Sequence, residues 1–227
     1  MNYDYLFIFA HPDDAFLGAG GTIKMSASKG KTLIVSLTNG AKDDKYKGQL
    51  RAKEMCRAAA IVNADCKILD YTDGEIFLEE LRVEPIRNLL LETNPKFIFT
   101  HSNNDAHIDH RSTNKIVTSC IHYIWHYCTN PNLQHVLYSM PIKLNFQTLC
   151  NCKATVMNDI STTIEHKIES IRCHESQKSY MEDNLKRAIA LNRLFGTFRN
   201  CEYVEGFQLD ETDYTGNNVV DWTLLSK

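Results

Sequence analysis

Short apolar runs alternate with segments of helical spacing along the first half of the chain. Runs without a polar break are typical of strands buried on both faces of a parallel sheet. Apolar residues three and four positions apart indicate helices between these runs. The pattern predicts strands over 6–10, 32–37, 66–69 and 97–100, and helices over 18–28, 49–62 and 83–92. This alternation is typical of βαβ units.

After residue 126 the pattern is less regular. It predicts strands over 134–140, 154–157 and 201–209, and helices over 164–173 and 180–194. No segment rich in Ser, Gly or Pro separates these elements from the first half. We therefore predict a single α/β domain over 1–227. Its core, 1–126, is a Rossmann-like, doubly wound and mostly parallel sheet, and 127–227 form a C-terminal α/β extension.

The composition is that of a folded globular protein. Of the 227 residues, 43% are hydrophobic and 23% are charged, which argues against disorder and coiled coil. The 25 Lys and Arg are outnumbered by 28 Asp and Glu, for a net charge of −3. This balance predicts neither a basic surface for nucleic acid nor a polybasic membrane signal.

The N-terminal segment and the cysteines bear on the cellular compartment. The first apolar run has only six residues and no basic region before it, so we expect no secretory signal. No stretch approaches the eighteen apolar residues of a membrane span. The eight cysteines are scattered, which is typical of reduced thiols. These features predict a cytoplasmic protein and leave a homo-oligomer open.

The first predicted strand ends in a motif that carries chemistry, His11-Pro12-Asp13-Asp14. In open α/β sheets, ligands bind beyond the carboxyl ends of the strands, near the point where the strand order reverses. Pro12 favours a tight, extended turn. Side chains of adjacent residues in an extended segment point to different sides, so Asp13 and Asp14 can have separate roles. The alternative is that one of them only caps the next helix.

A second motif follows the fourth predicted strand. His107 and His110 are three residues apart, so they share one face if a helix begins nearby. Asp109 lies between them and can accept a hydrogen bond from a ring nitrogen or from the helix amides. The alternative is that Asp109 only favours the helix dipole and that both histidines are surface residues.

The two motifs together favour a metal site. In a strand order of 3-2-1-4-5 the first and fourth strands are neighbours, so both motifs meet at one edge of the sheet. Two histidines and one aspartate then give two nitrogen donors, one oxygen donor and an open fourth position. That set is typical of catalytic zinc. The remaining aspartate and histidine would supply a base and an acid.

These residues resemble a known family. The segments 10–14 (AHPDD) and 107–111 (HIDHR) are similar to the two signature motifs of the PIG-L/LmbE-like zinc deacetylases, which remove acetyl groups from N-acetylglucosamine units. The paired motifs in this order are specific, and the similarity spans nearly the whole chain. Further similar segments are 18–23, 37–40, the helix with Arg51 and Glu54, and 174–177.

The resemblance implies a role for each motif residue. It implies that His11, Asp14 and His110 bind Zn²⁺ or another divalent metal. Asp13 matches the general base that activates water. His107 matches the residue that stabilises the oxyanion or protonates the leaving amine.

Two further roles are implied by the same resemblance. Asp109 would tune the imidazole of His107, and Arg51 would contact the substrate. For Arg51, the alternative is an ion pair on the helix surface with Glu54 or Asp43.

The chain departs from the family motif at one position, where Ala15 replaces a glutamate. That glutamate is not a metal ligand, so the ligand set is retained. The predicted function is a zinc-dependent hydrolase that removes the acetyl group from a small N-acetylglucosamine-type sugar or glycoconjugate intermediate and releases acetate. One alternative, motivated by Ala15, is a weakly active or non-catalytic protein that binds metal or sugar. The other is a deacylase of a non-sugar amide.

Overall fold

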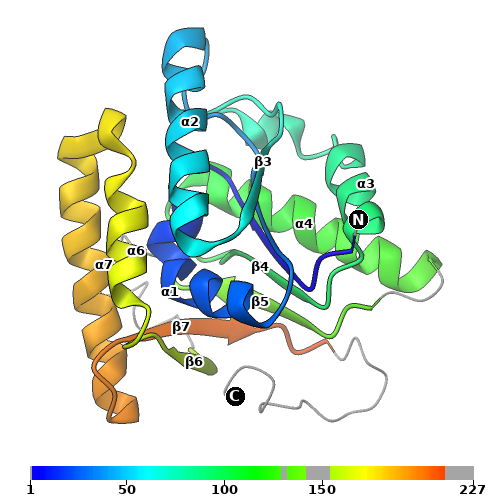
Figure 1. Ribbon diagram of the computed structural model, residues 1–227. Coiled ribbons are helices and arrows are strands. Elements are labelled where there is room, and N and C mark those ends of the chain that lie inside the picture. Colours follow the sequence, from blue (N-terminus) through cyan, green and yellow to red (C-terminus); the bar gives the residue numbers. More distant parts are fainter. Residues whose placement is uncertain (1, 129–131, 142–153, 213–227) are drawn as a thin grey trace.

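A seven-stranded sheet lies at the centre of the protein in the computed structural model, which describes residues 2–128, 132–141 and 154–212 (Figure 1). Its strands run in the order β3-β2-β1-β4-β5-β7-β6. The first five are parallel, and β7 pairs antiparallel with both β5 and β6. This confirms the predicted fold class and the 3-2-1-4-5 order. The strands are β1 (Tyr5–Phe9), β2 (Thr32–Ser36), β3 (Asp65–Ile68), β4 (Phe97–His101), β5 (His135–Ser139), β6 (Val156–Asp159) and β7 (Val204–Leu209).

Helices cover both faces of this sheet, as Figure 1 shows. Helices α1 (Asp14–Lys29), α2 (Lys45–Val62), α6 (Ile164–Arg172) and α7 (Lys178–Arg199) contribute to the core on one face. Helices α3 (Glu84–Thr93) and α4 (Ile108–Tyr127) cover the other. Two short 3-10 helices are η1 (Ile76–Glu79) and η2 (Glu175–Gln177).

Both faces of β1 are buried, which explains its unbroken apolar sequence. Phe7 and Phe9 point into the core under α1, whereas Leu6 and Ile8 point into the core under α3 and α4. The ring of Phe7 stacks on that of Phe99 in β4, with centroids 4.3 Å apart. The central strands are therefore held by apolar contacts on two sides.

Helix α1 begins at Asp14, earlier than the predicted residue 18, so its predicted start was wrong. A kink at Ala19 (φ −144°, ψ 16°) divides the helix. The backbone N–H groups of Gly21 and Thr22, just after the kink, donate to the carboxylate of Glu205 on β7 at 3.1 and 2.7 Å. Glu205 therefore caps the second part of α1, which corresponds to the predicted helix.

A buried ion pair holds this cap in place. Nζ of Lys167 on α6 lies 2.6 Å from Oε1 of Glu205, and neither side chain is more than 1% exposed. A Cβ atom at Gly20 would lie 2.9 Å from Cγ of Lys167. The close approach of α6 to α1 therefore depends on the absence of a side chain at position 20.

Helix α2 also begins before its predicted start at residue 49. The carboxylate of Asp44 accepts the N–H of Lys47 at 2.9 Å and caps the helix, which begins at Lys45. The other predicted elements are present with shifted ends; the longest shift extends α7 from the predicted 180–194 to 178–199. No described helix is long and apolar enough to cross a membrane. Six cysteines are free thiols, and Cys150 and Cys152 lie outside the described residues.

Candidate metal centre and active site

The two sequence motifs lie side by side at one edge of the sheet. The turn from His11 to Asp14 follows β1, and the segment with His107 and His110 follows β4. Strands β1 and β4 pair in parallel, so their carboxyl ends point the same way. The loop after β3 reaches the same edge, where Asp73 contacts His11.

Three side chains direct possible metal ligands toward one another. Oδ2 of Asp14 lies 3.0 Å from Nδ1 of His11 and 3.3 Å from Nε2 of His110. One ligand atom from each residue lies within 4.8 Å of the other two. Ligands in a zinc tetrahedron with bonds of 2.0–2.2 Å are about 3.3–3.6 Å apart. The predicted ligand set is therefore brought together at a spacing close to that of a metal site.

Carboxylates face the opposite nitrogen of each imidazole. Nε2 of His11 lies 3.1 Å from Asp73 and 3.3 Å from Asp109. Nδ1 of His110 lies 2.9 Å from Asp105. A carboxylate at one ring nitrogen keeps the proton there and leaves a lone pair on the other, which is the usual arrangement around metal-binding histidines. Once each ring loses its second proton, the nitrogen that faces Asp14 is the one available to a metal.

These contacts also shift the pKa values of the metal-free protein. Burial lowers the pKa of His11, but Asp14 and Asp109 outweigh burial and hold it well above its usual value. Burial likewise opposes the carboxylates of Asp14 and Asp105 at His110, whose pKa is raised to about 9. Burial raises the pKa of Asp14, but the two histidines hold it well below its usual range. Without metal, the site is a cluster of imidazolium and carboxylate groups.

Asp13, the neighbour of Asp14, pairs with Arg51 on α2. Nη2 of Arg51 lies 3.0 Å from Oδ1 of Asp13, and both side chains are buried. Nη1 of the same guanidinium donates to the backbone carbonyl of Gly40. Asp13 occupies the N-cap position of α1 but makes no side-chain cap, so helix capping does not explain it.

The structure rules out one of the two predicted settings of Arg51, and its predicted contact with the substrate stays a prediction. Arg51 is 7% exposed and bound to Asp13, so a surface ion pair with Glu54 or Asp43 is wrong. The carboxylate of Glu54 instead accepts the N–H and the hydroxyl of Ser176, each at 2.7 Å. The guanidinium contacts Asp13 directly, so it can influence a reaction by orienting that carboxylate.

The residues around His107 also differ in part from expectation. His107 is exposed at the start of α4, and its Nδ1 accepts the backbone N–H of Asp109 at 3.2 Å. The carboxylate of Asp109 accepts the N–H groups of Gly74 and Ile76 at 2.7 and 3.3 Å, and it contacts His11. The carboxylate therefore contacts His11 in addition to acting on His107: burial and the charge of His110 lower the pKa of His107, and Asp109 opposes them.

Three residues of this site were not assigned a role from the sequence. Nε2 of His101, at the end of β4, accepts the N–H of Ala10 at 3.0 Å. Burial and the charge of His110 lower the pKa of His101 to about 4, so this ring is neutral. Asp73 contacts His11 and Asp105 contacts His110, the two candidate ligand histidines. Both occur in polar loops, where an aspartate is equally typical of a turn.

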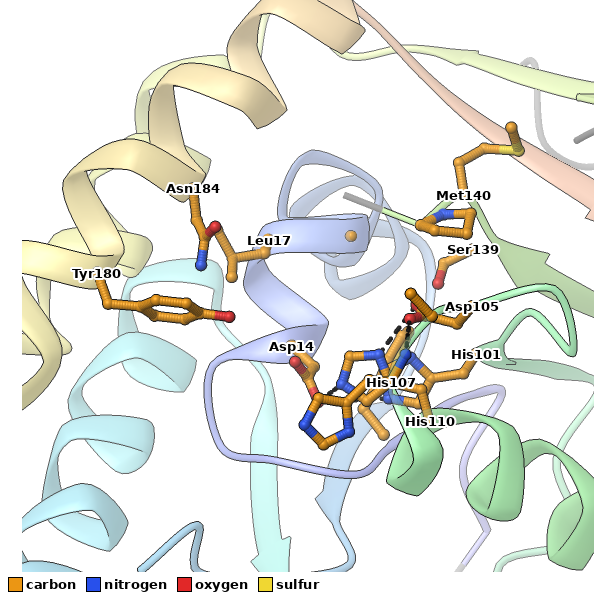
Figure 2. A pocket seen from close by; sticks show the side chains of 14 residues that line it. Asp14, Leu17, His101, Asp105, His107, His110, Ser139, Met140, Tyr180 and Asn184 are labelled. Atoms are coloured by element: carbon orange, nitrogen blue, oxygen red, sulfur yellow. Dashed lines mark hydrogen bonds and ion pairs between the residues drawn. The ribbon is translucent and has the colours of Figure 1, made fainter. Parts of the chain in front are cut away.

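A cavity of about 260 Å³ adjoins the candidate metal ligands (Figure 2). Asp14, His107 and His110 line one side of it, and Leu17 and Met140 line another. A metal site, a neighbouring carboxylate and a histidine beside a small cavity are the components of metal-assisted hydrolysis.

Comparison with a family model decides the family. The model described as PIG-L, GlcNAc-PI de-N-acetylase, matches residues 6–121, just over half of the chain. The chain belongs to the PIG-L family. The match contains both motifs, so the resemblance noted from the sequence is confirmed. Membership in a family of de-N-acetylases also confirms the expectation of a hydrolase.

Individual relatives of the PIG-L type are distant. The chain is 24% identical, over 199 residues, to the probable N-acetyl-α-D-glucosaminyl L-malate deacetylase 2 of Bacillus cereus, with 80% of this chain and 86% of that protein covered. The structure resembles the N,N'-diacetylchitobiose deacetylase of Pyrococcus horikoshii with a TM-score of 0.76, at 22% identity, over 98% of this chain and 88% of that one.

The same fold also occurs in a protein with a different named reaction. GalB of Pseudomonas putida, a 4-carboxy-2-hydroxymuconate hydratase, gives a TM-score of 0.76 at 19% identity, over 97% of this chain and all of that one. The fold is therefore compatible with more than one reaction, and the function has to be argued from the site.

Proposed function

We propose that this protein is a zinc-dependent deacetylase that removes the acetyl group from an N-acetylglucosamine-type sugar and releases acetate. The observation that carries the proposal is the convergence of His11, Asp14 and His110, with a carboxylate at the far nitrogen of each imidazole. We expect these three residues to bind the ion. Bound Zn²⁺ supplies a Lewis acid that polarises an amide carbonyl and lowers the pKa of water.

Asp13 is the proposed general base. Its Oδ1 is held by Arg51, which fixes the direction of the carboxylate. It takes a proton from the attacking water and returns that proton to the leaving nitrogen when the C–N bond breaks. The products are acetate and the free sugar amine.

His107 is the proposed oxyanion donor. Because its Nδ1 accepts the N–H of Asp109, the proton of the neutral ring lies on Nε2. His107 also lines the cavity, where this N–H can donate to the oxygen that gains negative charge as water adds to the acetamide carbonyl.

The names of the family model and of one relative support the proposed substrate class. The family model is described as a de-N-acetylase of an N-acetylglucosamine conjugate, and the Bacillus cereus relative is named for another such conjugate. The proposal accordingly commits to the N-acetylglucosamine unit and leaves its attached group open.

Acetate release from a small panel of compounds tests this proposal. The panel contains N-acetylglucosamine, N,N'-diacetylchitobiose, N-acetylglucosaminyl malate and a non-sugar N-acetyl amine, each with and without a chelator. We expect release from at least one sugar, loss of release with the chelator, and recovery with added Zn²⁺. Release from the non-sugar amide alone would favour a different deacylase, and bound zinc with no release would favour a non-catalytic protein.

A further inference from the structure

The wall of the cavity opposite the metal ligands is formed by α7. Figure 2 shows Tyr180 and Asn184 projecting from this helix toward Leu17, across from His107. Helix α7 lies outside residues 6–121, the range that the family model matches. The C-terminal part of the chain thus contributes directly to the site that the N-terminal motifs create.

Each of the other buried asparagines of the described residues donates a hydrogen bond, although Oδ1 of Asn192 has no partner. Asn114 donates to the carbonyl of His101 at 2.8 Å, Asn158 to the hydroxyl of Thr22 at 3.2 Å, and Asn192 to the carbonyl of Val204 at 2.9 Å. Asn184 is 3% exposed, yet its amide has no hydrogen-bond partner among the described residues.

The amide of Asn184 is available to a ligand in the cavity. Its two N–H groups and its carbonyl oxygen can together make several hydrogen bonds. The nitrogen and oxygen of this amide are open to the cavity rather than sealed from water, and no hydrogen bond within the described part of the fold uses them. The amide lines a cavity beside the metal ligands, and a ligand in that cavity would supply the missing partners.

We propose that Asn184 is a substrate-binding residue that hydrogen-bonds a hydroxyl group of the sugar ring. This inference rests on the proposed function, since it concerns the same cavity. An amide both donates and accepts, as a sugar hydroxyl does, and it carries no charge. Asn184 therefore selects a neutral, hydroxyl-bearing ring over an apolar N-acetyl compound of the same size.

The test compares Asn184→Ala with a matched control, Asn192→Ala, eight residues further along the same helix. Asn184 makes no hydrogen bond in the fold, so Asn184→Ala should leave the melting temperature unchanged or raise it. We expect unchanged zinc content and a KM for the sugar about five- to tenfold higher, the usual effect of one neutral hydrogen bond. Asn192→Ala loses its bond to Val204 and should lower the melting temperature, while KM stays at the wild-type value.

Deoxy sugars identify which hydroxyl group Asn184 binds. The 3-, 4- and 6-deoxy derivatives of N-acetylglucosamine each lack one hydroxyl group. If Asn184 binds one of these groups, removing it weakens wild-type turnover but causes no further loss in Asn184→Ala. An unchanged KM in Asn184→Ala, together with a fall in melting temperature like that of the control, would overturn the proposal.

The same variants separate this inference from the proposed function. If the wild-type protein releases no acetate from any sugar, the proposed function fails, and calorimetric binding of N-acetylglucosamine then decides the role of Asn184. Weaker binding to Asn184→Ala than to the wild-type protein would support that role. Equal binding, or no binding to either protein, would reject it.

Discussion

Nη2 of Arg51 lies 3.0 Å from Oδ1 of Asp13, and the two side chains are only 9% and 6% exposed. A charge that is removed from water needs a partner, and each of these groups provides one for the other. The carbonyl of Gly40 holds the same guanidinium from another direction. Arg51 is therefore suited to orient Asp13.

Replacing Arg51 with methionine tests this role. We expect Arg51→Met to lower the free energy of unfolding by about 3 kcal/mol, because it leaves Asp13 buried without its partner. It should also lower kcat with little change in KM. The control is Arg51→Lys. Its single ammonium group keeps the charge but cannot contact Asp13 and the carbonyl of Gly40 as the guanidinium does, so an intermediate kcat is expected. A higher KM at constant kcat would instead mean that Arg51 contacts the substrate.

The two adjacent aspartates should respond differently to the same substitution. Asp13→Asn should retain zinc and lose activity by about 10²–10⁴-fold, the usual contribution of a positioned general base. Asp14→Asn should instead lose zinc, because it removes a ligand charge. Zinc content by elemental analysis, measured beside acetate release, distinguishes the two. Equal loss of metal in both variants would contradict the assignment.

Metal binding should release protons. The pKa of His110 is raised to about 9 and that of His11 lies well above its usual value, so both rings are protonated near neutral pH in the metal-free protein. Each must lose a proton to bind zinc, so about two protons should be released and the affinity should rise with pH until the rings are neutral. Calorimetry in buffers with different ionisation enthalpies counts them.

A single-ligand variant provides the control for this count. His110→Ala should reduce the number of released protons by about one, whatever the remaining affinity. Zinc binding to the wild-type protein without proton release would show that the histidines are already neutral.

Restoring the family glutamate at position 15 is expected to harm the protein. Ala15 is 1% exposed and belongs to the apolar core beneath α1. Added side-chain atoms overpack such a site and typically cost about 1–3 kcal/mol, and a carboxylate adds the cost of burying a charge. We expect both Ala15→Glu and the uncharged control Ala15→Gln to unfold more easily, Ala15→Glu the more so. A large gain in acetate release in Ala15→Glu alone would identify the natural chain as a degenerate family member.

Much of the fold was predictable because the central strands are buried on both faces. Their apolar runs mark the strands, and alternation with helices fixes a parallel order. The division of α1 at Ala19 was not predictable in the same way. The kink is capped by Glu205, which lies 184 residues beyond Gly21, and no local pattern reports a partner so distant.

The parts of the site that depend on local sequence motifs were predictable. His11, Asp14 and His110 follow neighbouring parallel strands, so topology alone brings them together. The contact of the Asp109 carboxylate with His11 was not predicted, because the direction of this side chain depends on the N–H of Gly74 in a loop after β3. Contacts between loops depend on backbone conformations that residue types do not specify.

Glu205 has a consequence for how the protein can be divided. Both family motifs lie within the first half of the chain, yet the helix that begins at Asp14 receives its cap from β7. A fragment that ended before Glu205 would leave the N–H groups of Gly21 and Thr22 without an acceptor and Lys167 without its counter-charge. Such a fragment would hold every proposed zinc ligand and still lack the frame that aligns them. A fragment made to transfer this site to another protein, by grafting or by domain exchange, must therefore extend through β7.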